Sequence, residues 1–385
     1  MKKYLVITLS YILLFFNTNS FSNEIKKNEL KVGLLAPFSG QYKDLGDSIM
    51  FSLQMALDEI GNKRVTIVTR DSGSGDKTIL NNSIQEIIDE GVKVIIGPIN
   101  FEDFEEVKKY KDTIFISPSN MSPKIENNII SIGVSLESQL KAIDKFISNQ
   151  KKTKTVILYP KNQYAEMIDK KIQSSNFKNY KIFKYNPDPM ILTGEIEKLT
   201  NYSQRKRNLE ARKKFLADKE DEASERELEQ LEQMYTLGNV NFDSVIVIDF
   251  GNSLKSTLTS LVFSEVDQNK ILFTTVNQWF DKSMFYENSL KKIYYPSVNF
   301  KNFERFQKKY IKLYNREPSE ISILTYDAFG LIYYVWKKNK DIKSIKDFSI
   351  KEKIKGKIGT FSFKEGEVRQ DLKIYKAENN TFTKF

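Results

Sequence analysis

The side chains able to do chemistry in this chain are mainly carboxylates, lysines and tyrosines, because the sequence contains no histidine and no cysteine. These absences exclude a cysteine or serine–histidine nucleophile, a histidine acid or base, and a zinc site of cysteine and histidine. Four carboxylates follow or flank predicted strand ends and could approach a cleft: Asp47, Asp71, Asp103 and Asp249. Nothing in their spacing pairs them as acid and base. We therefore expect a protein that is not an enzyme and that uses no cofactor and no metal.

The N-terminus has the pattern of a secretory signal peptide. A basic start, "MKK", precedes the apolar run "YLVITLSYILLFF", and Ser20 and Ser22 occupy the small positions before a cleavage site after residue 22. The run is short for a bilayer span, and a retained N-terminal anchor is the alternative interpretation. No cysteine is available for acylation or disulfides. We expect a periplasmic protein that is not a lipoprotein and has no transmembrane segment in its mature chain.

The chain is basic, with 60 Lys and Arg against 50 Asp and Glu and a formal net charge of +10. Such a balance can indicate an acidic partner. However, the lysines are scattered along the whole sequence, and no arginine-rich stripe with interleaved aromatic residues is present. We therefore expect no nucleic-acid partner.

Short apolar runs alternate with segments of helical periodicity along most of the 385 residues. The runs "LKVGLLA" and "VKVIIGP" are continuous, as in strands buried on both faces of a parallel sheet. The helical segment "SIMFSLQMALDEI" between them has apolar residues at helical spacing. This alternation predicts an α/β fold with right-handed crossovers. A second α/β unit covers about residues 151–277, and the tail, which turns at "KEGE", predicts a β-hairpin.

In open parallel sheets, ligands bind beyond the carboxyl ends of the strands. Those ends carry hydroxyl, amide and aromatic side chains, which suit a small polar ligand between two lobes. The candidate ligand-binding residues are Ser39, Gln41, Tyr42 and Leu45 after the first strand, Asn100 and Phe101 after the third, Ser119 and Asn120 after the fourth, and Tyr164, Asp249, Asn277 and Gln278 in the second unit. Ordinary turn chemistry is the alternative for each loop taken singly. No glycine-rich phosphate-binding motif is present.

An ordered series of segments resembles the type 1 periplasmic solute-binding proteins of the leucine/isoleucine/valine-binding kind. The series runs from "LKVGLLAPFSGQYKDLGDSIMFSLQMALDEI" through "IFISPSN" and "VILYPKNQYAEMI" to "TYDAFGLI" and "KIGTFSFKEGEVRQDLKIYKA". The resemblance implies two Rossmann-like lobes joined by three crossings that close on a ligand by hinge motion. We expect lobe 1 at residues 23–150 and 280–340, and lobe 2 at residues 151–279 and 341–385, to which the tail returns.

The candidate site departs from the amino-acid-binding members that the resemblance implies. Those members grip the α-carboxylate with serine and threonine, whereas Asn100 and Phe101 follow the third strand here. Asn277 and Gln278 stand where an acid would hold the α-ammonium, and Leu45 stands where an aromatic residue would shield the ligand, although Tyr164 matches. A buried ammonium without a carboxylate partner is costly. The pattern therefore disfavours a free amino acid as ligand.

Residues 198–238 interrupt the α/β pattern with about forty mostly charged residues. We expect an antiparallel helical hairpin, with one basic and one acidic helix. The predicted seam contains Leu199, Tyr202, Leu209 and Leu216 on one arm and Leu228, Leu231 and Tyr235 on the other. Ser224 and Glu227 would form a capping box, and Gly238 would end the second helix. The insertion is either a solvated surface feature or a docking arm for another protein.

The insertion and the following "TLGNVNFDSVIVIDFGNSLKSTL" resemble the penicillin-binding-protein activators, a branch with this fold that regulates peptidoglycan synthases. That resemblance implies a non-catalytic periplasmic regulator whose partner is a peptidoglycan synthase. The alternative function is the substrate-binding subunit of an ABC importer, with an ABC permease as its partner and an amino acid or similar small polar solute in the cleft.

Overall fold

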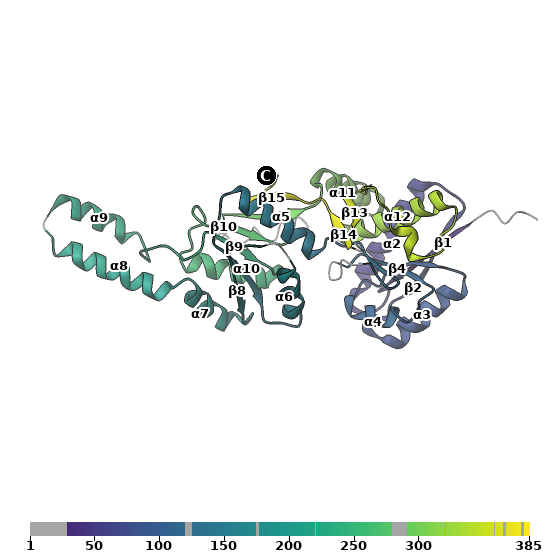
Figure 1. Ribbon diagram of the computed structural model, residues 1–385, viewed down its shortest axis with the longest axis horizontal. Coiled ribbons are helices and arrows are strands. Elements are labelled where there is room, and N and C mark those ends of the chain that lie inside the picture. The colour runs from purple at the N-terminus through teal and green to yellow at the C-terminus, as the bar shows by residue number, and fades with distance from the viewer. Residues whose placement is uncertain are drawn as a thin grey trace, which may run out of the picture.

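The computed structural model describes residues 29–119, 125–174, 177–219, 221–278, 291–319, 321–357, 359–364, 367–378 and 381–385. The expected signal peptide at residues 1–22 lies outside this part of the chain. The described residues form two α/β lobes side by side, and a helical hairpin projects from the second lobe on the side away from the first (Figure 1). The predicted fold class is confirmed.

The first lobe is built on a six-stranded sheet with the order β2-β1-β3-β4-β6-β5. All neighbouring pairs are parallel except β5 with β6. The strands are β1 (Leu30–Ala36), β2 (Val65–Asp71), β3 (Val94–Ile96), β4 (Ile114–Ser117), β5 (Ile125–Glu126) and β6 (Ile129–Ser131). The helices of this lobe are α2 (Lys43–Ile60), α3 (Lys77–Asp89), α4 (Phe104–Val107), α11 (Phe300–Tyr314) and α12 (Ser322–Asn339).

The core of the first lobe explains why its strands are continuous apolar runs. Leu34 and Ile96 face one hydrophobic core, which also contains apolar residues of α2 and α12. Leu35 and Ile95, their neighbours in sequence, face a second core that contains residues of α3. The sheet is therefore covered on both faces, as parallel sheets require.

The second lobe contains a seven-stranded sheet with the order β16-β15-β11-β10-β9-β7-β8. Its first five strands in sequence are parallel, and the two from the tail are antiparallel. The strands are β7 (Thr155–Pro160), β8 (Tyr180–Tyr185), β9 (Ser244–Val247), β10 (Leu272–Thr275), β11 (Lys292–Ser297), β15 (Lys373–Glu378) and β16 (Thr381–Lys384). The helices are α5 (Leu136–Asn149), α6 (Ala165–Gln173), α7 (Pro189–Leu199) and α10 (Gly251–Phe263). The projecting hairpin consists of α8 (Tyr202–Ala217) and α9 (Glu222–Glu232).

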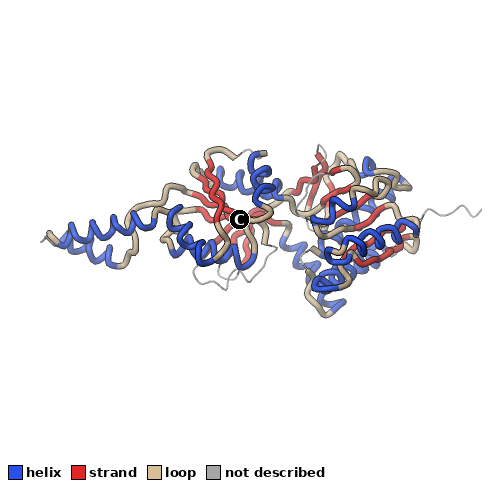
Figure 2. Tube along the Cα trace, turned by 90° about the horizontal axis from the view of Figure 1, so that it is seen from below, coloured by secondary structure: helices blue, strands red, loops and turns tan. Residues whose placement is uncertain are grey.

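The sheets divide the chain at residues that differ from the expected boundaries. Strand β11 lies in the second sheet and α5 packs on it, whereas we expected both segments in lobe 1. A small third sheet of β12 (Ile354–Lys355), β13 (Thr360–Lys364) and β14 (Glu367–Gln370) precedes the tail strands, and its β13–β14 pair is the predicted hairpin. The chain thus crosses between the lobes three times, at residues 132–135, 298–299 and 371–372. Figure 2 shows the two lobes as separate bodies of helices and strands that are joined where they meet.

One ionic cluster ties the C-terminal helices to α2. Glu59 on α2 accepts hydrogen bonds from Lys309 on α11 and from the Tyr326 hydroxyl on α12, and Lys357 lies 3.3 Å from its Oε2. Burial alone would raise the pKa of Glu59, but these hydrogen bonds and the charge of Lys357 lower it to about 2. The ionised form is therefore the one that the folded state stabilises.

We predict that Glu59→Gln destabilises the protein by about 1–2 kcal/mol at pH 7, because a charged acceptor with several donors is lost. The folded-state pKa is lowered, so the contribution of Glu59 is complete above about pH 4.5 and disappears as the pH falls toward 2. Urea unfolding of both proteins across this pH range measures the difference. An equal difference at pH 7 and at the acid end would contradict the ionic origin. The exposed Glu90→Gln serves as a control because its ion pair with Arg70 lies at the surface.

Candidate functional site

The loop after β1 is held in place by Asp71 at the end of β2. The Asp71 carboxylate accepts hydrogen bonds from the Phe38 N–H (2.8 Å) and the Ser39 hydroxyl (2.5 Å). Helix α2 then begins close against this loop, since a Cβ on Gly46 would lie 1.9 Å from the Pro37 carbonyl oxygen. Burial raises the pKa of Asp71, but the hydrogen bonds from this loop outweigh it and lower the pKa overall. Asp71 therefore supports the loop as an ionised acceptor.

The candidate residues on this loop differ in their surroundings. Ser39, Gln41 and Tyr42 are exposed, with Tyr42 half exposed at 50%. Leu45 instead lies partly buried against the main hydrophobic core of the lobe. The loop thus offers hydroxyl, amide and aromatic groups to solvent at the carboxyl edge of the sheet, while Leu45 contributes to packing.

The candidate residues Asn100 and Ser119, after β3 and β4, form hydrogen bonds within their own lobe. The exposed Asn100 accepts a hydrogen bond from the Glu102 N–H (3.2 Å) and so forms the turn that leads through Phe101 toward α4. Ser119 is buried, donates its N–H to the Ser117 hydroxyl (3.1 Å) and accepts a bond at its carbonyl from Ser131 (3.1 Å). Asn120 lies outside the described residues.

The corresponding edge of the second lobe is mostly closed by its own hydrogen bonds. Tyr164 precedes α6 and is 37% exposed. Asp249 is buried and accepts bonds from the Tyr185 hydroxyl, the Phe250 N–H and the Ser253 hydroxyl at 2.5–2.8 Å. Burial, and in second place the charge of Asp249, raise the pKa of the Tyr185 hydroxyl, which therefore remains a neutral donor. Asp249 is therefore engaged within the lobe.

The two amides after β10 are also engaged within the protein. Asn277 donates its side-chain amide to the Ser297 hydroxyl (2.8 Å), and its N–H donates to the Gln139 side-chain oxygen (2.6 Å). The Gln278 amide donates to the Asp249 carbonyl oxygen (2.9 Å). Both side chains are buried, at 2% and 6% exposed. These contacts with Gln139 and Ser297 were not foreseen, because both partners lie far from residue 277 in the sequence.

The four candidate carboxylates are not brought together as a catalytic pair. Asp47 forms an i,i+4 ion pair with Lys43 (2.6 Å), whereas Asp71 and Asp249 hold loops in different lobes. Asp103 begins α4 with its side chain making no capping hydrogen bond. Within the described residues, no cluster of acidic side chains is arranged to hold a metal ion. These four carboxylates are therefore not paired with one another as acid and base.

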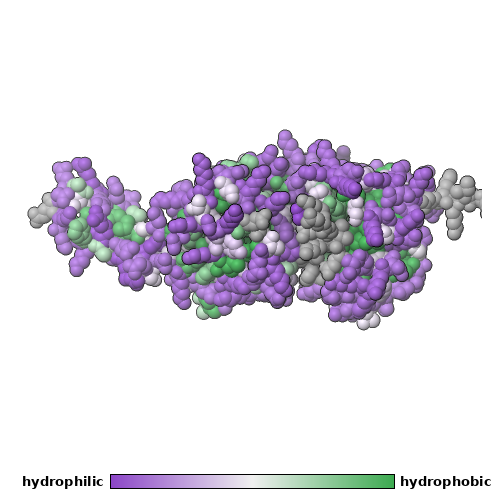
Figure 3. Space-filling model, in the orientation of Figure 1, coloured by the Kyte–Doolittle hydropathy of each residue, from purple (hydrophilic) through white to green (hydrophobic). Residues whose placement is uncertain are grey.

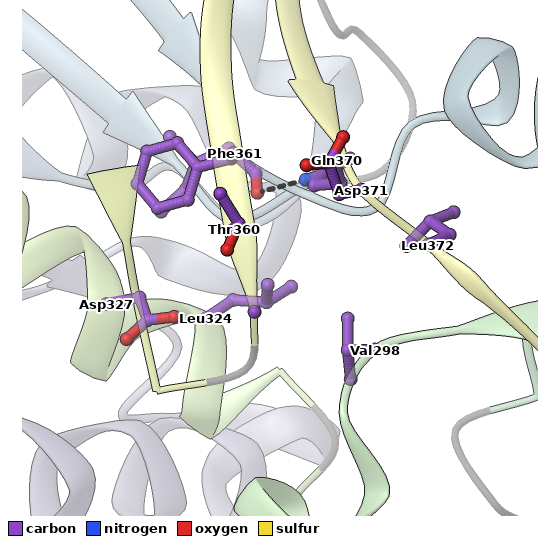
Figure 4. Close-up of a pocket in the computed structure, with 10 residues that line it drawn as sticks. Val298, Leu324, Asp327, Thr360, Phe361, Gln370, Asp371 and Leu372 are labelled. Atoms are coloured by element: carbon purple, nitrogen blue, oxygen red, sulfur yellow. Dashed lines mark hydrogen bonds between the residues drawn. The ribbon is translucent and has the colours of Figure 1, made fainter. Parts of the chain in front are cut away.

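The cavity at the junction of the lobes is small and mainly apolar. Ile132, Val298 and Leu372, one from each crossing, line it together with Phe361 and Gln370. Figure 4 shows that Val298 and Leu372 lie on neighbouring crossings and that the Asp371 N–H donates to the Thr360 carbonyl oxygen. The cavity has room for about one water molecule. It is part of the packed hinge and contains none of the candidate ligand-binding residues.

The charged insertion folds as the predicted helical hairpin, which we call the arm (residues 202–232). Leu209 and Leu216 on α8 and Leu231 on α9 are buried in its small apolar seam, and Leu228 and Leu237 pack against them. Arg212 donates two hydrogen bonds to the Glu227 carboxylate, at 2.8 and 2.7 Å. The surface of the arm in Figure 3 is mainly hydrophilic. The arm therefore has little apolar core of its own.

Several details of the predicted arm were wrong. Asp221, not Ser224, caps α9 by accepting the Ser224 N–H (2.9 Å), because Glu227 is engaged by Arg212. Helix α9 ends at Glu232, so Gly238 does not close it. Tyr235 is 69% exposed, outside the seam. Two further seam residues contact the lobe instead: Leu199 packs against the main core, and Tyr202 stacks on Phe263 with ring centroids 6.4 Å apart.

The base of the arm is fixed to the second lobe by Arg205, which is only 4% exposed. Its guanidinium donates to the carbonyl oxygens of Thr200 (3.0 Å), Ser264 and Glu265 (3.2 Å), and to the Thr236 hydroxyl (3.1 Å). The Ser264 and Glu265 carbonyls lie at and just after the C-terminal end of α10, where a cation is favoured. Burial lowers the pKa of Arg205. Each of its four hydrogen bonds goes to an uncharged oxygen. The sequence had suggested only a basic helix face at this position.

A family model described as "Periplasmic binding protein" matches residues 29–176. Solved structures extend the similarity to nearly the whole chain. The isoleucine complex of the branched-chain amino acid transporter substrate-binding protein LivJ from Streptococcus pneumoniae is 18% identical, with coverage of 93% of this chain and 99% of that one and a TM-score of 0.57. This chain has the type 1 periplasmic binding protein fold. The predicted resemblance is therefore confirmed at the level of the fold.

Two further structures of the same fold show its range. The leucine-binding protein LivK from Thermotoga maritima is 13% identical over 92% of this chain and 97% of its own, with a TM-score of 0.58. The LpoA C-domain from Haemophilus influenzae, a regulator of PBP1A, is 13% identical over 92% and 99%, with a TM-score of 0.60. A search of curated proteins by sequence gives no significant match. Solute-binding proteins and a regulator thus share the fold of this chain, with similar sequence identities and TM-scores.

Asp103 is a buried carboxylate at the carboxyl edge of the first sheet. Burial, together with the negative charges of Glu102 and Glu106, raises the pKa of Asp103 from 3.8 to about 6. The positive charge of Lys77 lowers the pKa but does not outweigh them. Because the folded state holds this proton more tightly than the unfolded state, ionisation of Asp103 costs stability as the pH rises from 3.8 to about 6. The ionised group is thus a source of instability at neutral pH.

We predict that Asp103→Asn raises the free energy of unfolding by about 1–3 kcal/mol at pH 7.5, because it removes a buried charge. The gain should shrink as the pH falls and vanish below the unfolded-state pKa of 3.8. Denaturant unfolding at several pH values measures it, and Asp112→Asn on an exposed loop is the control. A stability gain that does not change with pH would show that the charge of Asp103 is not its cause.

Proposed function

We propose that this protein is a non-catalytic periplasmic regulator of peptidoglycan synthesis, similar in role to the penicillin-binding-protein activators. The observation that carries the proposal is the arm, which extends from the second lobe and is fixed to it by Arg205 (Figure 1). A surface feature without a role needs no buried guanidinium at its base. A docking arm does, because the partner must meet it at a defined angle.

The charges of the arm support a protein partner. Helix α8 carries six basic side chains and one acidic one, and α9 carries five acidic side chains and one basic one. Such a two-signed surface selects a partner whose charges are arranged in the opposite order, and it disfavours membranes or nucleic acids of a single sign. The partner that we propose is a peptidoglycan synthase in the periplasm. Among the described residues, no helix is both long and apolar enough to cross a membrane.

A specific observation also favours a second candidate, the substrate-binding subunit of an ABC importer. Ser39, Gln41 and Tyr42 in the first lobe and Tyr164 in the second remain exposed at the two strand edges. These groups suit contact with a small polar solute between the lobes. The buried engagement of Asn277, Gln278 and Asp249 leaves the second edge with few groups for a charged ammonium. For that reason the regulator is the main proposal.

The proposal is tested with a trimmed arm in the otherwise complete mature protein. Residues 207–234 are replaced by a short glycine–serine linker, which leaves Arg205 and Thr236 at the base. Binding to a purified PBP1A-type synthase in detergent is measured by surface plasmon resonance, together with the rate of glycan polymerisation. We expect binding weaker by about tenfold or more, equivalent to about 1.4 kcal/mol, and loss of any change in the synthase rate.

Charge-reversal variants separate docking from folding. Lys206→Glu with Lys214→Glu alters exposed positions of α8, and Lys301→Glu with Lys312→Glu makes the same change at exposed positions of α11. Only the α8 pair should weaken binding. Undiminished binding by both the trimmed protein and the α8 pair would contradict docking through the arm. Failure of the intact protein to bind any synthase of this type would contradict the proposed function.

A further inference from the structure

Three crossings join the lobes, and amide side chains connect them. The first crossing is residues 132–135, the second is residues 298–299, and the third is residues 371–372. Each crossing follows directly on a strand, and backbone groups that leave a sheet need other hydrogen-bond partners. At the first crossing, glutamine side chains supply several of these partners.

Gln370 joins the third crossing to the first. Its side-chain amide donates to the carbonyl oxygens of Ile132 (2.9 Å) and Gly133, and its side-chain oxygen accepts the Ser135 N–H (3.1 Å). Its own N–H donates to the Ser138 hydroxyl (3.1 Å) on α5. One glutamine thus binds three backbone groups of the first crossing and one side chain of the helix that follows it.

Gln139 and Asn277 continue the connection to the second crossing. The Gln139 amide donates to the Val134 carbonyl oxygen (3.0 Å), and its side-chain oxygen accepts the Asn277 N–H (2.6 Å). The Asn277 side chain then donates to the hydroxyl of Ser297 (2.8 Å), the last residue of β11 before the second crossing. Gln139, Asn277 and Ser297 are 4%, 2% and 0% exposed. Water therefore has little access to these bonds.

The chemistry of this path requires amides. Each of the two glutamines donates to a carbonyl and accepts from an N–H at the same time, which a carboxylate or an alkyl side chain cannot do. The path adjoins the small apolar cavity lined by Ile132, Val298 and Leu372. In such surroundings a hydrogen bond is stronger than in water, and an unpaired polar group costs more.

We propose that Gln370, Gln139 and Asn277, with Ser297, form an amide relay that couples the three crossings into one hinge and fixes the resting separation of the lobes. The relay also places Asn277, at the carboxyl edge of the second sheet, in direct contact with the hinge. A change at that edge is thereby transmitted to all three crossings. The proposal goes beyond the regulatory role and does not depend on the partner of the arm.

Local satisfaction of backbone groups, without any coupling, is the simpler explanation of each contact. It predicts that loss of one contact reduces stability but leaves the lobe arrangement unchanged. Coupling predicts that loss at one crossing changes the distance between the lobes, including when the altered residue lies at a different crossing. The two explanations therefore differ in a measurable property other than stability.

The chain has no cysteine, so spin labels can be placed at two chosen sites without further changes. Lys312→Cys on α11 labels the first lobe and Lys170→Cys on α6 labels the second, both at exposed positions. Pulsed electron–electron double resonance measures the distribution of distances between the two spin labels in the complete mature protein. The variants are Gln370→Leu, which removes the link from the third crossing to the first, and Ser297→Ala, which removes only a hydroxyl at the second. Gln150→Leu, an exposed glutamine at the end of α5, is the matched control.

We expect a shifted and broadened distance distribution for Gln370→Leu and for Ser297→Ala, and an unchanged one for Gln150→Leu. Circular dichroism identifies any variant that has not folded, and Ser297→Ala, the smallest change, keeps the test valid if Gln370→Leu does not fold. Distributions identical to that of the unaltered protein in the folded variants would overturn the relay, whatever their loss of stability. A synthase-binding result would not bear on this outcome.

Discussion

A buried polar side chain must find hydrogen-bond partners, and this constraint governs both the hinge and the candidate site of the protein. At the carboxyl edge of the second sheet, Asp249, Asn277 and Gln278 have the chemistry to bind a ligand. Each is at most 8% exposed and is bonded within the protein. Release of any of these groups for a ligand would require the ligand to replace internal bonds of equal quality. The polar side chains at this edge therefore stabilise the fold of the second lobe.

The same constraint explains how a mostly charged hairpin becomes a defined feature. The seam of the arm buries only a few leucines, and surface ion pairs contribute little to stability. The buried guanidinium of Arg205, in contrast, bonds to four acceptors that belong to the arm base and to the end of α10. The position of the arm thus depends on contacts at its base, those of Arg205 above all, more than on its own core. The hinge is bonded by amides and the arm by a guanidinium, so in both places polar side chains fix the position of a segment outside the sheets.

The sequence predicted the main architecture because its signals are local. Continuous apolar runs such as Leu30–Ala36 indicate buried parallel strands, and leucines spaced seven apart, such as Leu209 and Leu216, indicate the arm. Strand β11, "KIYYPS", was missed because lysine, proline and tyrosines break the apolar pattern that marked the other strands. Ser224 was predicted to cap α9, but Asp221, three residues earlier, does so, and Glu227 pairs with Arg212 instead of completing a capping box.

The chemistry of the site was less predictable, because it depends on partners far apart in the sequence. The contact between Asn277 and Gln139 spans 138 residues, and the contact between Gln370 and Ser135 spans 235. The absence of an acid at residues 277 and 278 was visible in the sequence, but the internal use of both amides was not. Residues such as Tyr164 and Gln41, which remain exposed at the strand edges, were predicted from their positions alone and stay candidates for ligand contact.

The most direct test of the central claim, that the second edge is committed to internal bonds and not to ammonium recognition, is thermal unfolding of the mature protein with a panel of free amino acids. A ligand at 100 times its dissociation constant would add about 2.7 kcal/mol to the free energy of unfolding. We expect no shift of the unfolding temperature with any free amino acid at millimolar concentration. A clear shift of the unfolding temperature with one of them, abolished by Tyr164→Ala, would contradict it and favour the importer subunit.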